Sequence, residues 1–396
     1  PMPPTDRPHG PVSKVARTQL RERLAVNWAH LHAQDRIPGI DLARGLAVVG
    51  MFAAHLLWIT PLVWSDPGTW TGIVQDRSSI LFATLAGVSL GLMAGGTRRP
   101  TSSELPTLRA RLVYRSLLLW LIGVVLLGLG VPVYIILPAY AILFLLALPF
   151  LSLSPRQVLL AAGGIALLTP FLQAWVDAFP WWETGSGRMA AWLLGWYYPF
   201  PVWIAFVLAG LGLARTDIRR LRTQLAMLGA GTALAVLGYG LDAVSGTRDV
   251  PDDGAFWDVL WTAEPHSSGL LEVIGSGGFA IAAISVCLLA CRTPLIWITL
   301  PLRATGSMPL TAYIAQLLLW AVIASIGVGT TGDLAAFRDM APFWPLTIAT
   351  VTGRTVWALL FGRGPLERAM THLPARRSTS SGRSASRDDA HRSDVR

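Results

Sequence analysis

The chain has few charged residues and almost no lysine. Charged residues make up 14% of its 396 positions, and a single Lys stands against 31 Arg. Hydrophobic residues reach 53% and occur in long runs, which excludes an ordinary soluble domain and is typical of a polytopic helical membrane protein. The net charge of +9 is concentrated in a few segments. We therefore interpret it as a signal of membrane topology and not of nucleic-acid binding.

Cysteine is scarce as well. Cys287 and Cys291 lie four residues apart near the end of an apolar run, a spacing that favours packing on one helix face over a disulfide or a metal site. The sequence has no P-loop, no dinucleotide-binding fingerprint and no cluster with metal-ligand spacing. We therefore expect neither ATP hydrolysis nor a bound metal.

The apolar runs predict an all-α bundle of about ten transmembrane helices. The predicted spans are 40–62, 78–96, 112–130, 133–152, 156–174, 190–214, 222–243, 268–291, 308–328 and 342–361. With the N-terminus in the cytoplasm, 27 of the 32 Lys and Arg residues fall on the cytoplasmic side and four fall outside. This bias predicts a multi-pass protein of the plasma membrane with both termini in the cytoplasm.

Three regions follow from this pattern. Residues 1–38 are predicted to be a cytoplasmic basic arm, in which 15–32 is either an amphipathic helix on the membrane surface or a disordered segment. Residues 39–372 form the predicted transmembrane domain. Residues 373–396 are rich in Arg, Ser and Asp and are predicted to be a disordered basic tail. The sequence leaves open whether the protein forms a homodimer.

The first predicted helix carries three ionisable side chains, Asp41, Arg44 and His55. A charge inside a membrane helix costs at least about 2.5–3.5 kcal/mol, so such groups usually face protein or a water-filled cavity. Arg44 and His55 return to within about 20° of the same face, and His55 lies about 16 Å further along the helix. His55 is therefore the first candidate for a general base or acyl carrier. Asp41 and Arg44 either bind a donor or only pair with each other.

A second constellation lies at the outer start of the predicted helix 268–291. Glu272 is expected at about the depth of His55, where it either orients that imidazole as in a catalytic triad or pairs with an arginine. His266, on the preceding loop, is a weaker candidate. Asp76 and Arg77, at the start of the second predicted helix, either cap it or bind substrate.

Two polar side chains in the ninth predicted helix complete the candidate set. Tyr313 and Gln316 either line a cavity for substrate or donor, or make hydrogen bonds between helices.

Arg44 and His55, in a first helix preceded by Ile40-Asp41, resemble the signature of the acyltransferase-3 membrane proteins. The segment 39–55 followed by 76–87 also resembles the start of the heparan-α-glucosaminide N-acetyltransferase catalytic domain. Residues 301–313 resemble part of a bacterial family, domain of unknown function 418. Together these resemblances cover most of residues 36–370.

The resemblance implies a ten-helix membrane acyltransferase that moves an acyl group, most simply acetyl, from cytoplasmic acyl-CoA to a hydroxyl or amine of an extracytoplasmic sugar or lipid. It makes His55 the catalytic histidine and Arg44 its partner. The chain departs from the glucosaminide acetyltransferases in one respect. They place their active histidine in the first outer loop, and residues 65–75 contain none.

Two other classes of function stay open. The same polar face suits a transporter or flippase for a glycolipid or small metabolite, which would move its substrate without changing it covalently. A non-catalytic membrane protein on the same fold is the third hypothesis, favoured if no cavity reaches His55.

Overall fold

The computed structural model describes residues 11–33, 36–63, 65–245 and 256–370, with side chains from residue 17 onward. Over these residues the chain forms helices and no β-strand, which confirms the all-α prediction. The α-helices are α1 (Pro11–Leu31), α2 (Pro38–Leu56), α3 (Arg77–Met93), α4 (Leu105–Leu127), α5 (Leu137–Leu146), α6 (Pro155–Asp177), α7 (Gly185–Leu194), α8 (Phe200–Ala214), α9 (Leu221–Ser245), α10 (Phe256–Leu260), α11 (Leu270–Ala290), α12 (Leu295–Ile298), α13 (Leu300–Gly306), α14 (Pro309–Gly327), α15 (Leu334–Asp339), α16 (Phe343–Phe361) and α17 (Pro365–Ala369). Three 3₁₀ turns are η1 (Pro67–Val74), η2 (Leu148–Ser152) and η3 (Pro180–Glu183). The predicted tail, 373–396, lies outside the described residues.

Six helices in the described part of the chain are long and apolar enough to cross a membrane: α2, α4, α6, α9, α11 and α14. The apolar helices α5 and α8 are shorter. Each of the ten apolar segments predicted from the sequence contains a helix, with α3 and α16 occupying the remaining two. Three of the differences in their boundaries bear on the arrangement of the bundle.

The first difference is at the end of α2, which stops at Leu56 although the apolar run continues to residue 62. Leu57 has an extended backbone, with ψ at 153°. Further along, Thr60 precedes Pro61, and the residue before a proline avoids the helical region. The last part of the apolar run is therefore a loop.

The second difference is a break inside the predicted span 190–214. Gly195 ends α7 in the left-handed region, at φ +67°, a conformation that glycine adopts without steric cost. Pro201 lies in the first turn of α8, where a missing N–H does no harm.

The third difference is the late start of α5, at Leu137 instead of residue 133. Residues 131–136 are not helical, yet Val131, Val133, Ile135 and Ile136 are all buried. Non-helical backbone at membrane depth is tolerated only inside protein or beside a cavity. This segment therefore runs inside the bundle and places α5 within it.

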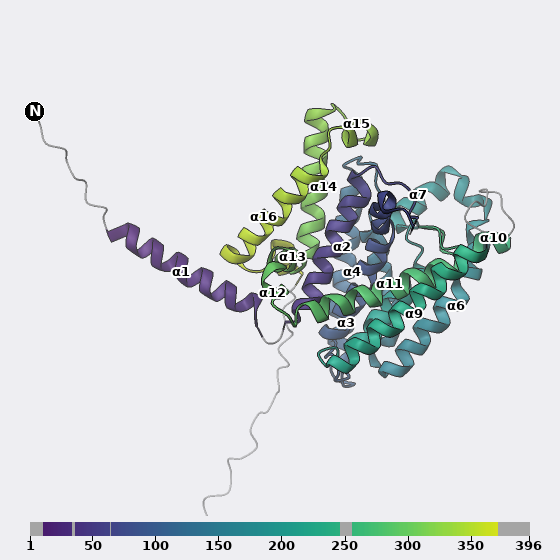
Figure 1. Ribbon diagram of the computed structural model, residues 1–396, viewed down its shortest axis with the longest axis horizontal. Coiled ribbons are helices and arrows are strands. Elements are labelled where there is room, and N and C mark those ends of the chain that lie inside the picture. Colours follow the sequence, from purple (N-terminus) through teal and green to yellow (C-terminus); the bar gives the residue numbers. More distant parts are fainter. Residues whose placement is uncertain (1–10, 34–35, 64, 246–255, 371–396) are drawn as a thin grey trace, which may run out of the picture.

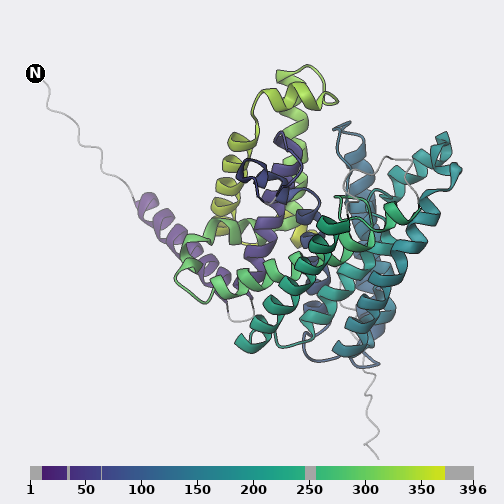
Figure 2. The ribbon, with the colours of Figure 1, turned by 45° about the vertical axis from the view of Figure 1, so that its right-hand side comes forward.

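Helix α2 is the element that connects the two sides of the bundle. It packs against α3 and α11 on one side and against α13, α14 and α16 on the other. Figures 1 and 2 both show α14 and α16 on the opposite side of α2 from α6 and α9. Helix α1 extends away from the body and touches it near its C-terminal end, where Asn27 Nδ2 donates to the Leu359 carbonyl at 2.9 Å.

Small residues allow the closest helix contacts. A Cβ added to Gly87 of α3 would collide with the Val207 carbonyl of α8, and one added to Gly210 would collide with the Thr84 carbonyl. Such small-residue contacts are the usual way in which membrane helices pack closely, because no hydrophobic effect drives them together in lipid. The α3–α8 pair is therefore fixed by glycine.

We expect Gly87→Ala to lower the free energy of unfolding by roughly 1–3 kcal/mol, since the added methyl overpacks the α3–α8 contact. Gly163→Ala on α6 is the matched control, because a Cβ there meets nothing within 4 Å. Thermal unfolding in detergent measures both variants. Equal melting temperatures for the two would contradict the close α3–α8 contact.

Candidate functional site

The first candidate cluster lies at the N-terminal end of α2. Asp41 accepts from Arg36 Nη2 at 2.7 Å and from Arg44 Nη1 at 3.0 Å. Arg44 also donates to Ser89 Oγ on α3 at 2.8 Å. Asp41 is in the first turn of its helix, where the helix dipole favours a negative charge. Two guanidinium groups thus share one carboxylate, and the cluster carries a net positive charge.

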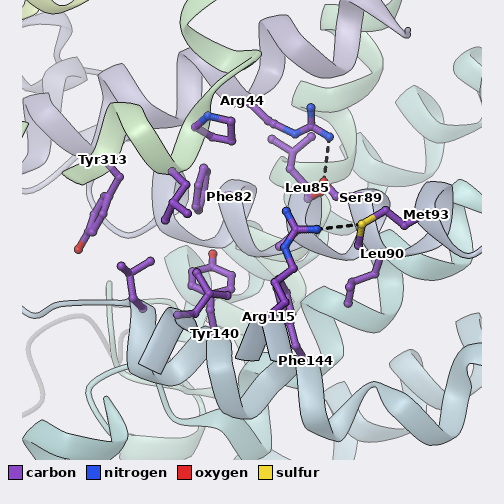
Figure 3. Close-up of a pocket in the computed structure, with 15 residues that line it drawn as sticks. Arg44, Phe82, Leu85, Ser89, Leu90, Met93, Arg115, Tyr140, Phe144 and Tyr313 are labelled. Atoms are coloured by element: carbon purple, nitrogen blue, oxygen red, sulfur yellow. Dashed lines mark hydrogen bonds between the residues drawn. The ribbon is translucent and has the colours of Figure 1, made fainter. Parts of the chain in front are cut away.

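A cavity of about 110 Å³ opens beside Arg44 (Figure 3). Its walls are mostly apolar and come from α3, α4, α5 and α14. In this view the Arg44 and Arg115 side chains lie to the right of Tyr140, and Tyr313 lies further to the left. Arg115 Nη1 contacts Met93 Sδ at 2.9 Å and has no carboxylate partner in the described part of the chain. The cavity therefore joins a cationic end to a phenolic end.

The two tyrosines differ in their hydrogen bonds. The Tyr313 hydroxyl accepts from the Ile136 backbone N–H at 3.3 Å. The buried Tyr140 hydroxyl, which lines the cavity, has no hydrogen-bond partner among the described residues. Tyr140 is thus a donor available to a ligand.

The second cluster joins the start of α3 to the loop before α11. His266 Nδ1 lies 3.2 Å from Asp76 Oδ1. The His266 side chain is 43% exposed and the Asp76 side chain is 2% exposed. Asp76 occupies the N-cap position of α3 but makes no capping bond with its side chain. Its carboxylate faces the imidazole, an arrangement that can orient a general base.

Glu272 fixes the loop that carries His266. Its carboxylate accepts from the backbone N–H groups of His266 and Ser268, each at 2.6 Å, and from Ser267 Oγ at 3.1 Å. The Tyr198 ring lies 6.1 Å from the His266 ring. Glu272 therefore acts on the backbone of the loop and holds the imidazole against Asp76.

Backbone strain concentrates in the same cluster. Among the described residues, four other than glycine have positive φ, and three of them are Asp76 (57°), His266 (65°) and Ser268 (55°). Each such conformation costs of order 1–3 kcal/mol and tends to mark functional sites. The hydrogen bonds to Glu272 are the contacts that hold two of these three residues in place.

Arg77 belongs to a separate network beside Asp76. Its Nε donates to the Tyr239 hydroxyl at 2.7 Å, and that hydroxyl lies 2.8 Å from Ser276 Oγ on α11. The guanidinium carbon also lies 4.6 Å from the Tyr239 ring centroid. Arg77 thus links α3 to α9 and α11 beneath the His266 loop.

His55 lies in a different environment. Its ring centroid is 6.3 Å from that of Trp320 on α14, and its carbonyl accepts from Arg338 Nε at 2.9 Å. Within the described residues, no hydrogen bond or ion pair joins it to Glu272. Gln316 is buried on α14, four residues before Trp320. The structure therefore brings Asp76, His266 and Glu272 together. His55 lies within electrostatic range of His266, but no hydrogen bond or ion pair joins it to any of the three in the described part of the chain.

Sequence reasoning missed Arg115 and Tyr140. The available signal for Arg115 was its position in the apolar part of α4. Tyr140 gave no signal, because the buried segment 131–136 that positions α5 breaks the helical pattern. No group of three or more metal-binding side chains occurs in the described ranges.

These helices and their apolar lengths define a multi-pass membrane protein. A family model described as heparan-alpha-glucosaminide N-acetyltransferase, catalytic, matches residues 36–240, and the chain belongs to this membrane acetyltransferase family. A second model, a protein family of unknown function (DUF418), matches residues 257–376. No match was found among curated proteins. The two matches meet in space, since Asp76 lies in the first and His266 in the second.

We expect Glu272→Gln to lower the free energy of unfolding by roughly 1–3 kcal/mol, because either orientation of the amide turns an NH₂ group toward one buried N–H. Glu264→Gln, an exposed change on the same loop, is the control. Denaturant unfolding in detergent compares the two. A Glu272→Gln variant as stable as the control would show that the carboxylate does not hold the loop.

Proposed function

We propose that the protein transfers an acyl group from acyl-CoA, most simply acetyl-CoA, to a hydroxyl or amine of an extracytoplasmic sugar or lipid. The observation that carries this proposal is the cavity that joins Arg44 and Arg115 to the buried hydroxyl of Tyr140. Membership of the acetyltransferase family supports it. The substrates and residue roles below belong to the proposal.

The donor end is built for an anion inside an apolar wall. The side chains of Arg36, Arg44 and Arg115 bring three positive charges to this end. Asp41 pairs with the first two, and the Glu367 carboxylate acts on Arg115 without forming an ion pair. Arginine binds phosphate through a planar fork of donors. A second depression, lined by Arg36, Asp41 and Ser307 among others, shares Arg44 with the cavity. We place the nucleotide phosphates in this depression and the thioester arm in the cavity.

The thioester carbonyl would meet the tyrosines. The free Tyr140 hydroxyl donates to the developing oxyanion, a role that requires an unoccupied donor in a dry site. The Tyr313 hydroxyl already accepts from the Ile136 N–H, so we assign Tyr313 a structural role in the cavity wall. Tyr198, whose ring contacts His266, connects this region to the acceptor end. Gln316, on α14, takes no part in the proposed donor site.

At the acceptor end His266 is the base and Asp76 orients it. The acceptor O–H or N–H gives its proton to Nε2 of His266, the new acyl bond forms, the C–S bond breaks, and the CoA thiolate takes up a proton. Glu272 positions the loop that carries His266, and Arg77 positions the start of α3. The family resemblance implies a histidine in the loop before α3, which this chain lacks, and His266 lies beside Asp76 at the end of that loop.

His55 is the base proposed from the sequence alone. It lies near the C-terminal end of α2, where its carbonyl is fixed by Arg338. No carboxylate pairs with it in the described part of the chain. We therefore rank His266 first and make the comparison between the two histidines the test.

The orientation follows from the arginines. We propose ten spans in the plasma membrane with both termini and the Arg44 end in the cytoplasm, because 27 of the 32 Lys and Arg residues then lie inside. Acyl-CoA then reaches Arg44 from the cytoplasm, and His266 faces outward. This gives the two half-sites access to opposite sides of the membrane.

One observation favours a transporter as the second function. The buried non-helical segment 131–136 and the break at Gly195 interrupt two apolar segments inside the bundle. Discontinuous helices of this kind line substrate sites in transporters. Movement of a glycolipid or small metabolite without acyl transfer would decide for that function.

The donor site is tested by Arg115→Ala, which we expect to weaken acyl-CoA binding about 10- to 100-fold, the equivalent of one lost charge-assisted contact. Arg111→Ala, an exposed change one turn earlier on α4, should bind normally. Isothermal titration of the purified protein with acetyl-CoA measures both. Equal affinities would remove Arg115 from the donor site.

The base is tested by comparing His266→Ala with His55→Ala in an assay of radiolabelled acetyl-CoA, scored as CoA release and transfer. We expect His266→Ala to slow transfer by about 10²- to 10⁴-fold, the usual contribution of a general base. His55→Ala should retain most of the rate. The reverse result assigns the base to His55, and wild-type protein that is folded but releases no CoA counts against acyl transfer.

A further inference from the structure

Helices α14 and α16 run antiparallel, and contacts near both ends fix their register. Arg354 Nη2 on α16 donates to the Ala312 carbonyl on α14 at 3.2 Å. At the other end of α14, a Cβ added to Gly327 would lie 2.6 Å from Met340 Cε, just before α16 begins. Counting inward from these contacts places Thr350 level with Gln316.

The same count places Thr347 level with Trp320, one turn nearer the C-terminal end of α14. Gln316 and Trp320 are four residues apart, and Thr347 and Thr350 are three apart, so each pair shares one helix face. Trp320 in turn contacts the His55 ring. The register therefore aligns polar side chains from Arg354 to His55.

Every one of these levels carries a buried polar atom that has no hydrogen-bond partner among the described residues. These atoms are Arg354 Nη1, Thr350 Oγ1, Gln316 Oε1, Thr347 Oγ1 and Trp320 Nε1. Their residues are between 0% and 8% exposed. A buried polar atom without a partner costs about 1–3 kcal/mol, so five of them in a row need other partners.

The two threonines do not use the partner that their helix offers. Thr355 on the same helix donates to the Val351 carbonyl at 2.8 Å, and Ser325 on α14 donates to the Ala321 carbonyl at 2.7 Å. Such bonds to the preceding turn are the common solution for hydroxyls in membrane helices. Thr347 and Thr350 make no such bond and keep their hydroxyls available.

We propose that the α14–α16 interface holds a file of ordered water molecules that runs from Arg354 to His55. Internal waters typically make about three hydrogen bonds to buried polar groups of this kind. The waters would pair the five atoms and reach the His55 imidazole, which makes no hydrogen bond to the described residues.

Arg354 lies at the end of the proposed file near the start of α14, and its unpaired N–H is the last of the five polar atoms. Glu367, which accepts from the N–H groups of Leu310 and Thr311, closes the start of α14 next to it. The file would therefore keep His55 hydrated from within the bundle, whichever histidine serves as the base.

Radiolytic hydroxyl-radical labelling of the purified protein in detergent tests the file, because radicals form from water and label side chains in contact with it. Trp320 and Trp203 are matched probes, since they are 0% and 4% exposed. We expect Trp320 to be labelled several-fold more than Trp203. Labelling of Trp320 no higher than that of Trp203 would overturn the proposal.

Variants separate internal water from leakage at the His55 end. Thr350→Val keeps the side-chain shape, removes one hydroxyl deeper in the interface, and should lower Trp320 labelling at least two-fold. Thr355→Val is the control, since that hydroxyl is satisfied by its own helix. If Thr350→Val leaves the labelling of Trp320 at the level of the control, the water lies only at the His55 end. That result would overturn the proposal.

Discussion

The structure depends on how the charged side chains at the start of α2 are accommodated in an apolar bundle. A single ionised group at membrane depth costs several kcal/mol unless protein groups replace its water. Asp41 forms ion pairs with both Arg36 and Arg44, and Arg44 also donates a hydrogen bond to Ser89 on α3. This pairing leaves one cation in excess beside an apolar cavity. The pairing that stabilises α2 thus also leaves positive charge beside the cavity, where we propose that the acyl donor binds.

The far end of the bundle uses a different solution. Glu272 makes no ion pair with a cation in the described residues. It accepts from two backbone N–H groups and a serine hydroxyl, and its carboxyl group also interacts with that of Asp76. The carboxylate therefore stabilises a strained loop. The strain is offset locally, so the position of His266 depends on one buried acid.

Much of the fold could be predicted from the sequence, because apolar length and proline or glycine position determine where membrane helices begin and end. Gly195 and Pro201 carried the signal for the break before α8, although the run of apolar residues concealed it. The cavity could not be predicted. It depends on the depth of α5, and the buried segment 131–136 that sets this depth has no periodic pattern.

The candidate site shows the same limit. Asp41 and Arg44 are three residues apart on one helix, so their pairing follows from helical geometry and is seen in the structure. Asp76 and His266 are 190 positions apart in the chain, and no local pattern reports such a contact. The sequence favoured His55 over His266. Their neighbours distinguish them, since one faces a carboxylate and the other a tryptophan ring.

The two halves of the chain depend on each other at the site. Asp76 and the arginines come from the acetyltransferase match, whereas His266, Glu272 and Tyr313 come from the second match. The first half supplies the arginines of the cavity, but Pro309, Leu310 and Tyr313 of the second half complete its wall. The second half alone would hold a strained loop without the carboxylate that it faces. In the proposed reaction, the acyl donor and the base come together because α3 packs against α11, a contact that the structure shows. The site is therefore a property of the whole bundle, and an activity assigned to either half alone would lack half of its chemical groups.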